Sequence, residues 1–279
     1  MPLDATPYLT AFAEVHSPSS ASSARLWVPK FLTFLGNEPL TAGSLVAWCD
    51  SLKKEYAPAS QRKATATVKG YLRYLRLRGE LTIDSELVSL ALRSDDIPYR
   101  LPEVLEPEEI RKLCSAAAKS PTGIFLALGL LSGLRPGECL RVVPEHFRPN
   151  LGIVCYATKT KRERVVPTKD SVALQKIVAH PWPAGKRLCD GFSIFAWEKF
   201  TKATLGREVN RKTLRSTHAT YLASSDTITE YAYASRMGHS ATVGSNFYRI
   251  RREGVKGSTV EEWCGAADEL RGLADRLCS

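Results

Sequence analysis

The chain has 279 residues, which is too long for one small core and suits two domains. It is 44% hydrophobic and 24% charged, an ordinary globular composition, and its net charge of +10 comes from basic residues spread along its length. The N-terminus lacks the pattern of a signal peptide, and the most apolar stretch, residues 124–131, is too short to span a bilayer. We therefore expect a cytoplasmic protein without a membrane partner. Its charge favours a folded surface that faces a polyanion, with nucleic acid as the simplest choice.

The seven cysteines are irregularly spaced and several lie in apolar runs. None forms a CxxC pair, and no Cys/His cluster has zinc spacing. We expect all of them to be reduced core residues, and we expect no metal site.

The first 95 residues predict a small helical domain. Residues 1–20 are polar and rich in Pro and Ser, which indicates a loose arm. Apolar residues at helical spacing then predict four helices. The first begins at about residue 21, the second follows Thr41 as its cap, the third covers 59–78, and the fourth covers about 84–93.

The third of these helices is strongly basic. Few acidic residues separate its charges, so ion pairs within the helix do not explain them. One interpretation is a solvated face, the usual place of charges. The other, which we favour, is contact with double-stranded DNA through the basic side chains of this helix. The candidates are Arg62, Lys63, Lys69 and Arg73.

Residues 96–106 contain two prolines and no periodicity, and they predict a linker to a second domain over 107–279. That domain begins with two helices, from Pro107 and over about 122–132, followed by a short helix near Pro136. The β-branched residues of 151–157 and 163–167 predict a hairpin. Helices then continue to the C-terminus, where a long apolar face predicts one helix over about 258–277.

Five residues of this domain lie in contexts that suit phosphoryl transfer on DNA. Arginines can clamp the oxygens of a phosphodiester, Lys and His can donate protons or hydrogen bonds, and Tyr can attack phosphorus. Each residue has a common structural alternative, such as a paired core arginine, a solvated lysine or a packed tyrosine, so the order of the set carries the argument. The set is Arg135 in SGLRPGECL, Lys159 in KTKRERVVP, Arg215 in TLRSTHAT, and His239 and Tyr248 in MGHSATVGSNFY.

These four segments, in this order, resemble the catalytic domain of the tyrosine recombinases, the integrase and Xer-type family. The resemblance covers about residues 101–250 and implies a mainly α fold with a small β-sheet. The N-terminal domain fits the family's helical core-binding domain only by its size, helicity and charge.

The resemblance also implies roles for the site residues. Arg135 and Arg215 become the two arms of a phosphate clamp, with Glu138 orienting Arg135. Lys159 becomes the general acid that protonates the leaving 5′ oxygen. His239 donates a hydrogen bond to the scissile phosphate, and Tyr248 becomes the nucleophile. Phosphate contacts or exposed positions are implied for Lys161, Arg162 and Arg164.

One position departs from the family pattern. The family usually has His three residues before the second arginine, and this chain has Lys212 there. We expect Lys212 to be buried beside Arg135 and Arg215 and to take over phosphate stabilisation or proton acceptance. His218 is a weaker substitute, because it follows Arg215 instead of preceding it.

The activity implied is site-specific cleavage and rejoining of DNA through a 3′-phosphotyrosyl intermediate, without metal, ATP or another cofactor. The implied partners are DNA with a short inverted-repeat core site, three further copies of the chain in a synaptic tetramer, and accessory DNA-bending proteins. We expect the C-terminal helix to dock onto a neighbouring protomer through Trp263 and Leu270. The alternatives are a transposase, a telomere resolvase, a topoisomerase IB-like enzyme, or a non-catalytic DNA-binding protein derived from a recombinase.

Overall fold

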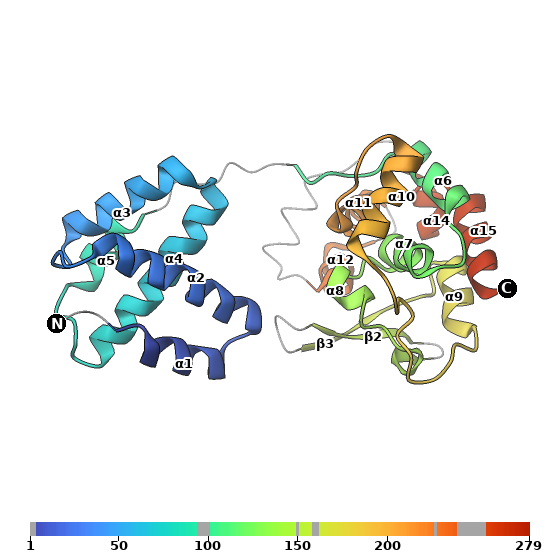
Figure 1. The fold of residues 1–279 in the computed structure, drawn as a ribbon. Helices are drawn as coiled ribbons and strands as arrows, with labels where there is room; N and C mark the ends of the chain where they lie inside the picture. Colours follow the sequence, from blue (N-terminus) through green and yellow to red (C-terminus); the bar gives the residue numbers. More distant parts are fainter. Residues whose placement is uncertain (1–3, 94–100, 149–150, 158–161, 226–227, 239–254) are drawn as a thin grey trace. The chain divides into compact units, whose positions relative to one another are not determined.

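The computed structural model describes residues 4–93, 101–148, 151–157, 162–225, 228–238 and 255–279. The chain separates into two compact units, Met1–Arg100 and Leu101–Ser279, each with its own hydrophobic core (Figure 1). In its described part the chain has no helix that is long and apolar enough to cross a membrane.

The first unit is helical throughout its described part. Its elements are α1 (Thr6–Val15), α2 (Pro18–Leu35), α3 (Ala42–Glu55), α4 (Pro58–Leu77) and α5 (Ser85–Ala91). Their apolar faces meet in one core, where Phe31, Trp48 and Tyr71 are buried. The helices predicted here are confirmed, including the cap of α3 by Thr41, whose hydroxyl accepts a hydrogen bond from the Ser44 amide.

The prediction of a loose arm over residues 1–20 is wrong, because α1 occupies half of this segment and α2 begins within it at Pro18. A proline lies in the first turn of α1, where a helix does not need the missing N–H, and Ser17 caps the start of α2. Tyr8 is buried against Tyr71 and Tyr74, with 5.3 Å between the ring centroids of each pair. The Pro and Ser residues of this segment therefore mark helix starts.

The second unit surrounds the apolar helix α7 with other helices and places a small sheet at one side (Figure 1). Its helices and its 3₁₀ turn η1 are α6 (Pro107–Ala116), α7 (Pro121–Ser132), α8 (Pro136–Cys139), η1 (Pro144–His146), α9 (Val172–Ala179), α10 (Ile194–Leu205), α11 (Arg211–Ser224), α12 (Glu230–Met237), α14 (Val260–Trp263) and α15 (Ala267–Cys278). Every residue of α7 from Gly123 to Ser132 is buried, as expected for a helix that is apolar on all sides.

The sheet is antiparallel, in the order β1 (Phe147–Arg148), β2 (Gly152–Ala157) and β3 (Arg162–Val166). The predicted hairpin is confirmed as β2 and β3. The sequence did not predict β1, because two residues are too few to show an alternating pattern. Its partner Ile153 and the opposite Val166 are both fully buried, which anchors the hairpin on the helices.

Residues 101–106 belong to the second unit, although they lie within the segment expected to be a linker. Leu105 is fully buried, its amide donates to Thr217 Oγ1 at 2.9 Å, and its carbonyl accepts from the Tyr221 hydroxyl at 3.3 Å. The Glu103 carboxylate also binds Arg207 and the Thr213 hydroxyl. This segment is therefore fastened along α11, the helix that carries Arg215.

The C-terminal segment differs from the prediction in two ways. It forms two helices, α14 and α15, separated at Gly265, which has φ of +60°. Its apolar face packs into the core of its own unit against α6, α7 and α9, where Trp263 and Leu270 are buried. In this structure these side chains are therefore not available to anchor the helix on a neighbouring protomer.

All seven cysteines are free thiols, and six of them are buried as expected, whereas Cys278 near the end of α15 is only partly buried. Burial raises the pKa of Cys189 to about 12, so this thiol stays protonated at neutral pH. The cysteines act as small apolar side chains of the two cores.

Gly133 ends α7 in a left-handed conformation, with φ of +62°, directly before the site residue Arg135. A Cβ at this position would lie 2.4 Å from His218 Cδ2 on α11. The turn therefore needs glycine for its backbone angle and for the close approach of a buried ring.

We expect Gly133→Ala to destabilise the protein by about 3 kcal/mol, from the left-handed strain plus displacement of His218. Gly206→Ala is the matched control, because Gly206 has φ of +75° and no atom within 4 Å of the place that an added Cβ would take. It should cost only about 1 kcal/mol. Urea unfolding of both variants measures the difference, and equal losses would contradict the role of the His218 contact.

Candidate active site

Arg135 lies between α7 and α8, where one carboxylate holds it twice. Glu138 Oε2 accepts the Arg135 amide at 2.7 Å, and Glu138 Oε1 accepts Arg135 Nη1 at 2.9 Å. The Glu138 side chain is only 4% exposed, whereas 35% of the Arg135 side chain remains exposed. Glu138 thus directs Arg135 while leaving it accessible.

Arg215 reaches the same place from α11. Its Nη1 donates to the Gly133 carbonyl at 2.6 Å, and its Nη2 donates to the Met237 carbonyl at 2.5 Å. Burial, together with the neighbouring positive charges of Arg135 and Arg164, lowers the pKa of Arg215 to about 9. The guanidinium remains charged at neutral pH and would gain from an anion placed beside it.

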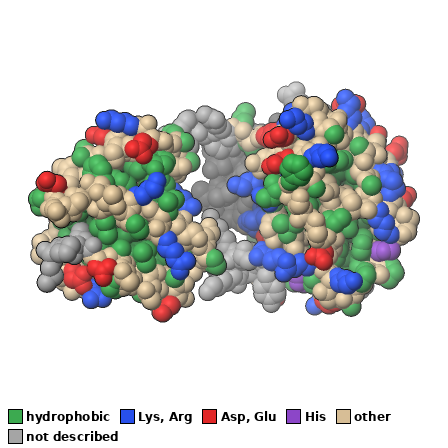
Figure 2. Space-filling model, in the orientation of Figure 1, with side chains coloured by type: hydrophobic (Ala, Val, Ile, Leu, Met, Phe, Trp, Pro, Cys, Tyr) green, Lys and Arg blue, Asp and Glu red, His purple; other side chains and the backbone are tan. Residues whose placement is uncertain are grey.

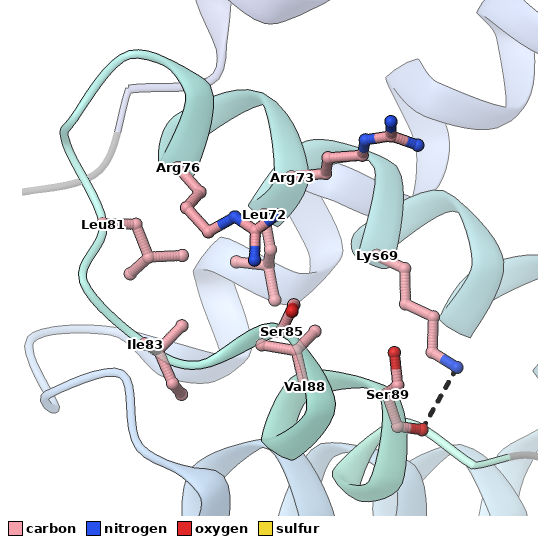
Figure 3. A pocket seen from close by; sticks show the side chains of 9 residues that line it. All are labelled: Lys69, Leu72, Arg73, Arg76, Leu81, Ile83, Ser85, Val88 and Ser89. Carbon is pink, nitrogen blue, oxygen red and sulfur yellow. Dashed lines mark hydrogen bonds between the residues drawn. The ribbon is translucent and has the colours of Figure 1, made fainter.

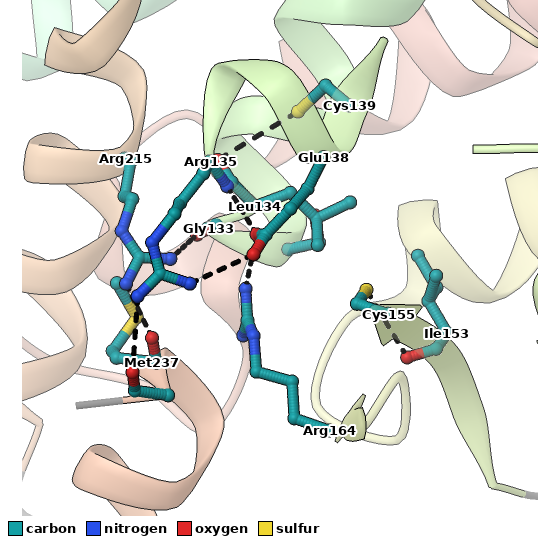
Figure 4. Close-up of polar contacts among 12 residues, drawn as sticks. Gly133, Leu134, Arg135, Glu138, Cys139, Ile153, Cys155, Arg164, Arg215 and Met237 are labelled. Carbon is teal, nitrogen blue, oxygen red and sulfur yellow. Dashed lines mark hydrogen bonds and ion pairs between the residues drawn. The ribbon is translucent and has the colours of Figure 1, made fainter. Parts of the chain in front are cut away.

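Three arginines donate to the last carbonyls of α12, and Figure 4 shows two of them, Arg135 and Arg215, beside Met237. Arg164 donates to the Arg236 carbonyl, Arg215 to that of Met237, and Arg135 Nη2 to that of Gly238 at 3.1 Å. These carbonyls form the negative end of the helix, where cations are favourable. The arginines therefore fix the point from which the chain continues towards His239 and Tyr248.

Glu138 is the anion at the centre of this cluster. Its Oε2 also accepts Arg164 Nη2 at 2.6 Å, so the carboxylate joins two arginines from different elements. Burial raises the pKa of Glu138, but the charges of Arg164 and Arg135 and the bond from the Arg135 amide outweigh it, and the net pKa lies below its usual value.

Arg164 corrects a prediction. We expected an exposed charge or a phosphate contact, but its side chain is only 8% exposed and is held by Glu138 and the Arg236 carbonyl. Because Arg164 lies on β3 opposite the buried Cys155, its side chain points towards the interior of the second unit. A nearby arginine that the sequence motifs did not single out, Arg236, is likewise buried and paired with Asp170.

An open pocket of about 700 Å³ lies beside the two clamp arginines. Among the described residues, its lining bears four basic side chains and no acidic one: Arg135, Arg211, Lys212 and Arg215. Such a lining suits a polyanion in extended contact with the surface. Ser216 and the first residues of α8 line the same opening.

Lys212 lines this pocket but is exposed, so the predicted burial beside Arg135 and Arg215 is wrong. It occupies the first turn of α11, capped by Asn210, where its side chain points to solvent. His218 does not line the pocket. It is buried on the other side of Gly133, with Nδ1 2.6 Å from the Leu130 carbonyl, and burial holds its pKa well below the usual value.

Four predicted site residues lie outside the described part of the chain: Lys159, Lys161, His239 and Tyr248. Arg162 begins β3, but its side chain is not described. The described members of the predicted catalytic set are therefore Arg135, Glu138, Lys212 and Arg215, with Arg164 buried beside them.

In the first unit the predicted DNA-binding residues lie on the outer face of α4. Arg62, Lys63 and Arg73 are exposed, and Lys69 is partly exposed, with its ammonium 3.3 Å from the Ser89 carbonyl. Figure 3 shows Lys69, Arg73 and Arg76 of α4 along a pocket of about 270 Å³ next to α5. Figure 2 shows further Lys and Arg side chains on the visible face of each unit.

Stability should depend on pH through Glu138. Its pKa is lower in the folded than in the unfolded protein, so its contribution is complete above the unfolded value of about 4.3 and is lost as the pH falls through the folded value. At pH 7, Glu138→Gln should cost about 3 kcal/mol, because it leaves buried Arg164 without its anion.

Urea unfolding at a series of pH values tests this expectation. From about pH 5 downward the unfolding free energy of the wild type should fall more steeply than that of Glu138→Gln. Parallel curves would contradict the assignment of a depressed pKa to Glu138.

The chain matches no family model and no curated protein. It is similar to solved structures of tyrosine recombinases. A lambda integrase dimer bound to a COC′ core site has 17% identity and a TM-score of 0.64, with coverage of 90% of this chain and 96% of that chain. A lambda integrase tetramer bound to a Holliday junction has 19% identity and a TM-score of 0.65, with coverage of 90% and 78%.

A post-cleavage complex of the XerH site-specific recombinase with a palindromic difH substrate has 13% identity and a TM-score of 0.60, with coverage of 84% of this chain and 77% of that chain. At these identities the likeness concerns the fold. The predicted fold class, mainly helical with one small sheet, is confirmed. The chain therefore has the fold of the tyrosine recombinases.

Proposed function

We propose that the protein is a tyrosine-type site-specific DNA recombinase. One observation carries the proposal: Arg135 and Arg215, from separate elements, converge at the end of α12 beside an open basic pocket. The fold shared with DNA-bound recombinases supports it. Two guanidinium groups held at one point can neutralise the charge that develops on a phosphorus during strand cleavage.

In the proposed reaction the oxygen of Tyr248 attacks a DNA phosphorus as its hydroxyl loses a proton to water. The bond from phosphorus to the 5′ oxygen breaks, and Lys159 donates a proton to the departing oxygen. The products are a 3′-phosphotyrosyl ester and a free 5′-hydroxyl. That hydroxyl, or one from a partner duplex, attacks the ester and rejoins the strand, so the reaction consumes no ATP.

His239 would donate a hydrogen bond to the same phosphate, and Lys212 would add a positive charge from the rim of the pocket. Because Lys212 is exposed, we assign it phosphate stabilisation and not proton acceptance. The basic side chains of α4, in the first unit, would bind the phosphates of duplex DNA.

Recombination between two duplexes would require four protomers, as in the lambda integrase tetramer on a Holliday junction. We propose the same stoichiometry here, on a short inverted-repeat site, with accessory DNA-bending proteins as further partners. Since α15 is packed into its own unit, the contacts between protomers would involve other surfaces.

Covalent capture tests the proposed activity. Wild type, Tyr248→Phe and Arg215→Ala are each incubated with nicked duplexes prepared from the source genome, then denatured in detergent, and the DNA bound to protein is sequenced. A nick beside the cleaved bond lets the 5′-hydroxyl fragment leave, which traps the adduct.

Wild type should capture DNA at one repeated site, Tyr248→Phe should capture none, and Arg215→Ala should react roughly 100-fold more slowly or worse. Equal capture by wild type and Tyr248→Phe would refute the assigned nucleophile. DNA binding in a gel shift without any adduct would indicate a DNA-binding protein that does not cleave.

The role of Lys212 is tested with the recovered site. Lys212→His keeps a hydrogen-bond donor at the rim, so its cleavage rate should stay within about tenfold of wild type, whereas Lys212→Met should lose more. Lys202→Met is the control, because Lys202 is an exposed lysine of α10 that does not line the pocket. A rate for Lys212→Met equal to that of Lys202→Met would remove Lys212 from the site.

A further inference from the structure

Arg164 is fixed on three sides, although the sequence indicated only an exposed charge or a phosphate contact. It lies on β3, and its guanidinium donates to Glu138 Oε2 at 2.6 Å and to the Arg236 carbonyl. Its stem also packs against the end of α12, since a Cβ on Gly238 would lie 2.7 Å from Arg164 Cδ. Arg164 thereby ties the sheet to Glu138 and to the end of α12, and both of these groups also bind Arg135.

These contacts bear directly on Arg135. The two oxygens of Glu138 divide between the arginines, with Oε2 facing Arg164 and Oε1 facing Arg135 Nη1. Without Arg164, the carboxylate would keep only its bonds from the Arg135 amide and Nη1, so it would no longer be tied to the sheet and would hold the Arg135 guanidinium less firmly. The Arg236 carbonyl belongs to the same helix end to which Arg135 and Arg215 donate.

We propose that Arg164 is a positioning residue that directs Arg135 through Glu138 and holds the end of α12 against both clamp arginines. It acts on the cleavage step without touching DNA, because its side chain is buried. This role rests on the recombinase activity proposed above.

A positioning role for Arg164 affects the cleavage step and not DNA binding. An arginine that contacts phosphate contributes to DNA affinity and to its dependence on salt, so its removal weakens binding and lowers the salt slope by about 1. Removal of a buried positioning residue should leave both quantities unchanged and slow the chemical step, because a misplacement of about 1 Å costs roughly 100-fold.

The experiment uses the nicked duplex recovered by covalent capture. Single-turnover cleavage, the dissociation constant and its salt slope are measured for Arg164→Met and Arg164→Lys, with thermal unfolding as a check on folding. Arg276→Met is the matched control, since Arg276 of α15 also donates to two backbone carbonyls, those of Cys114 and Ala117, outside the site.

We expect Arg164→Met to cleave roughly 10- to 100-fold more slowly with a dissociation constant within about twofold of wild type. Arg164→Lys keeps the charge but cannot bridge both acceptors with one planar group. Its cleavage rate should therefore lie between those of wild type and Arg164→Met. In an Arg135→Lys background, Arg164→Met should add little further loss, because both changes disable the same arm.

A wild-type cleavage rate in Arg164→Met would overturn the proposal. Full additivity of the rate losses of Arg164→Met and Arg135→Lys would overturn it too, as would an equal loss of rate in the control Arg276→Met. If Arg164→Met fails to fold, a wild-type rate in folded Arg164→Lys overturns it equally. Absence of any adduct with wild type is a different failure, since it refutes the recombinase activity and this role with it.

Discussion

The site depends on one buried carboxylate that bridges two arginines. Glu138 faces Arg135 with one oxygen and Arg164 with the other, and it also accepts the Arg135 amide. A buried charge of this kind is tolerable only when it is fully paired, so neither arginine can turn away without cost. Glu138 lies on α8, and its two partners lie at the start of α8 and on β3, so the carboxylate ties the sheet to the turn that carries Arg135.

The same cluster defines how the chain enters its proposed catalytic segment. Three successive carbonyls at the end of α12 accept three arginines, and the next residue is His239. Gly238 permits this arrangement through its left-handed φ of +60° and its lack of a side chain beside Arg164. Packing thus explains the glycine of the GHS motif. Residues 101–106 are fastened along α11, the helix that carries Arg215.

The motifs singled out Arg135, Glu138 and Arg215, and the structure brings these three residues into one cluster, in which a local turn joins Arg135 to Glu138 and Arg215 arrives from within α11. Tertiary packing decided what the sequence could not show. Arg164 stands in a run of basic residues that is typical of a solvated turn, and only its register opposite Cys155 turns it inward. Lys212 lies on the exposed side of the first turn of α11, where the neighbouring Thr213 and Leu214 are buried. Gly265 divides a stretch whose apolar spacing predicted one helix.

The central claim is that Arg135 and Arg215 neutralise a DNA phosphodiester. The most direct measurement compares cleavage of the normal site with cleavage of a site whose scissile phosphate carries an uncharged methylphosphonate. If the claim is correct, the rate loss caused by Arg215→Ala shrinks markedly on the neutral substrate, because less charge is left to stabilise. An equal loss on both substrates would mean that these arginines hold the fold together and do not serve the reaction.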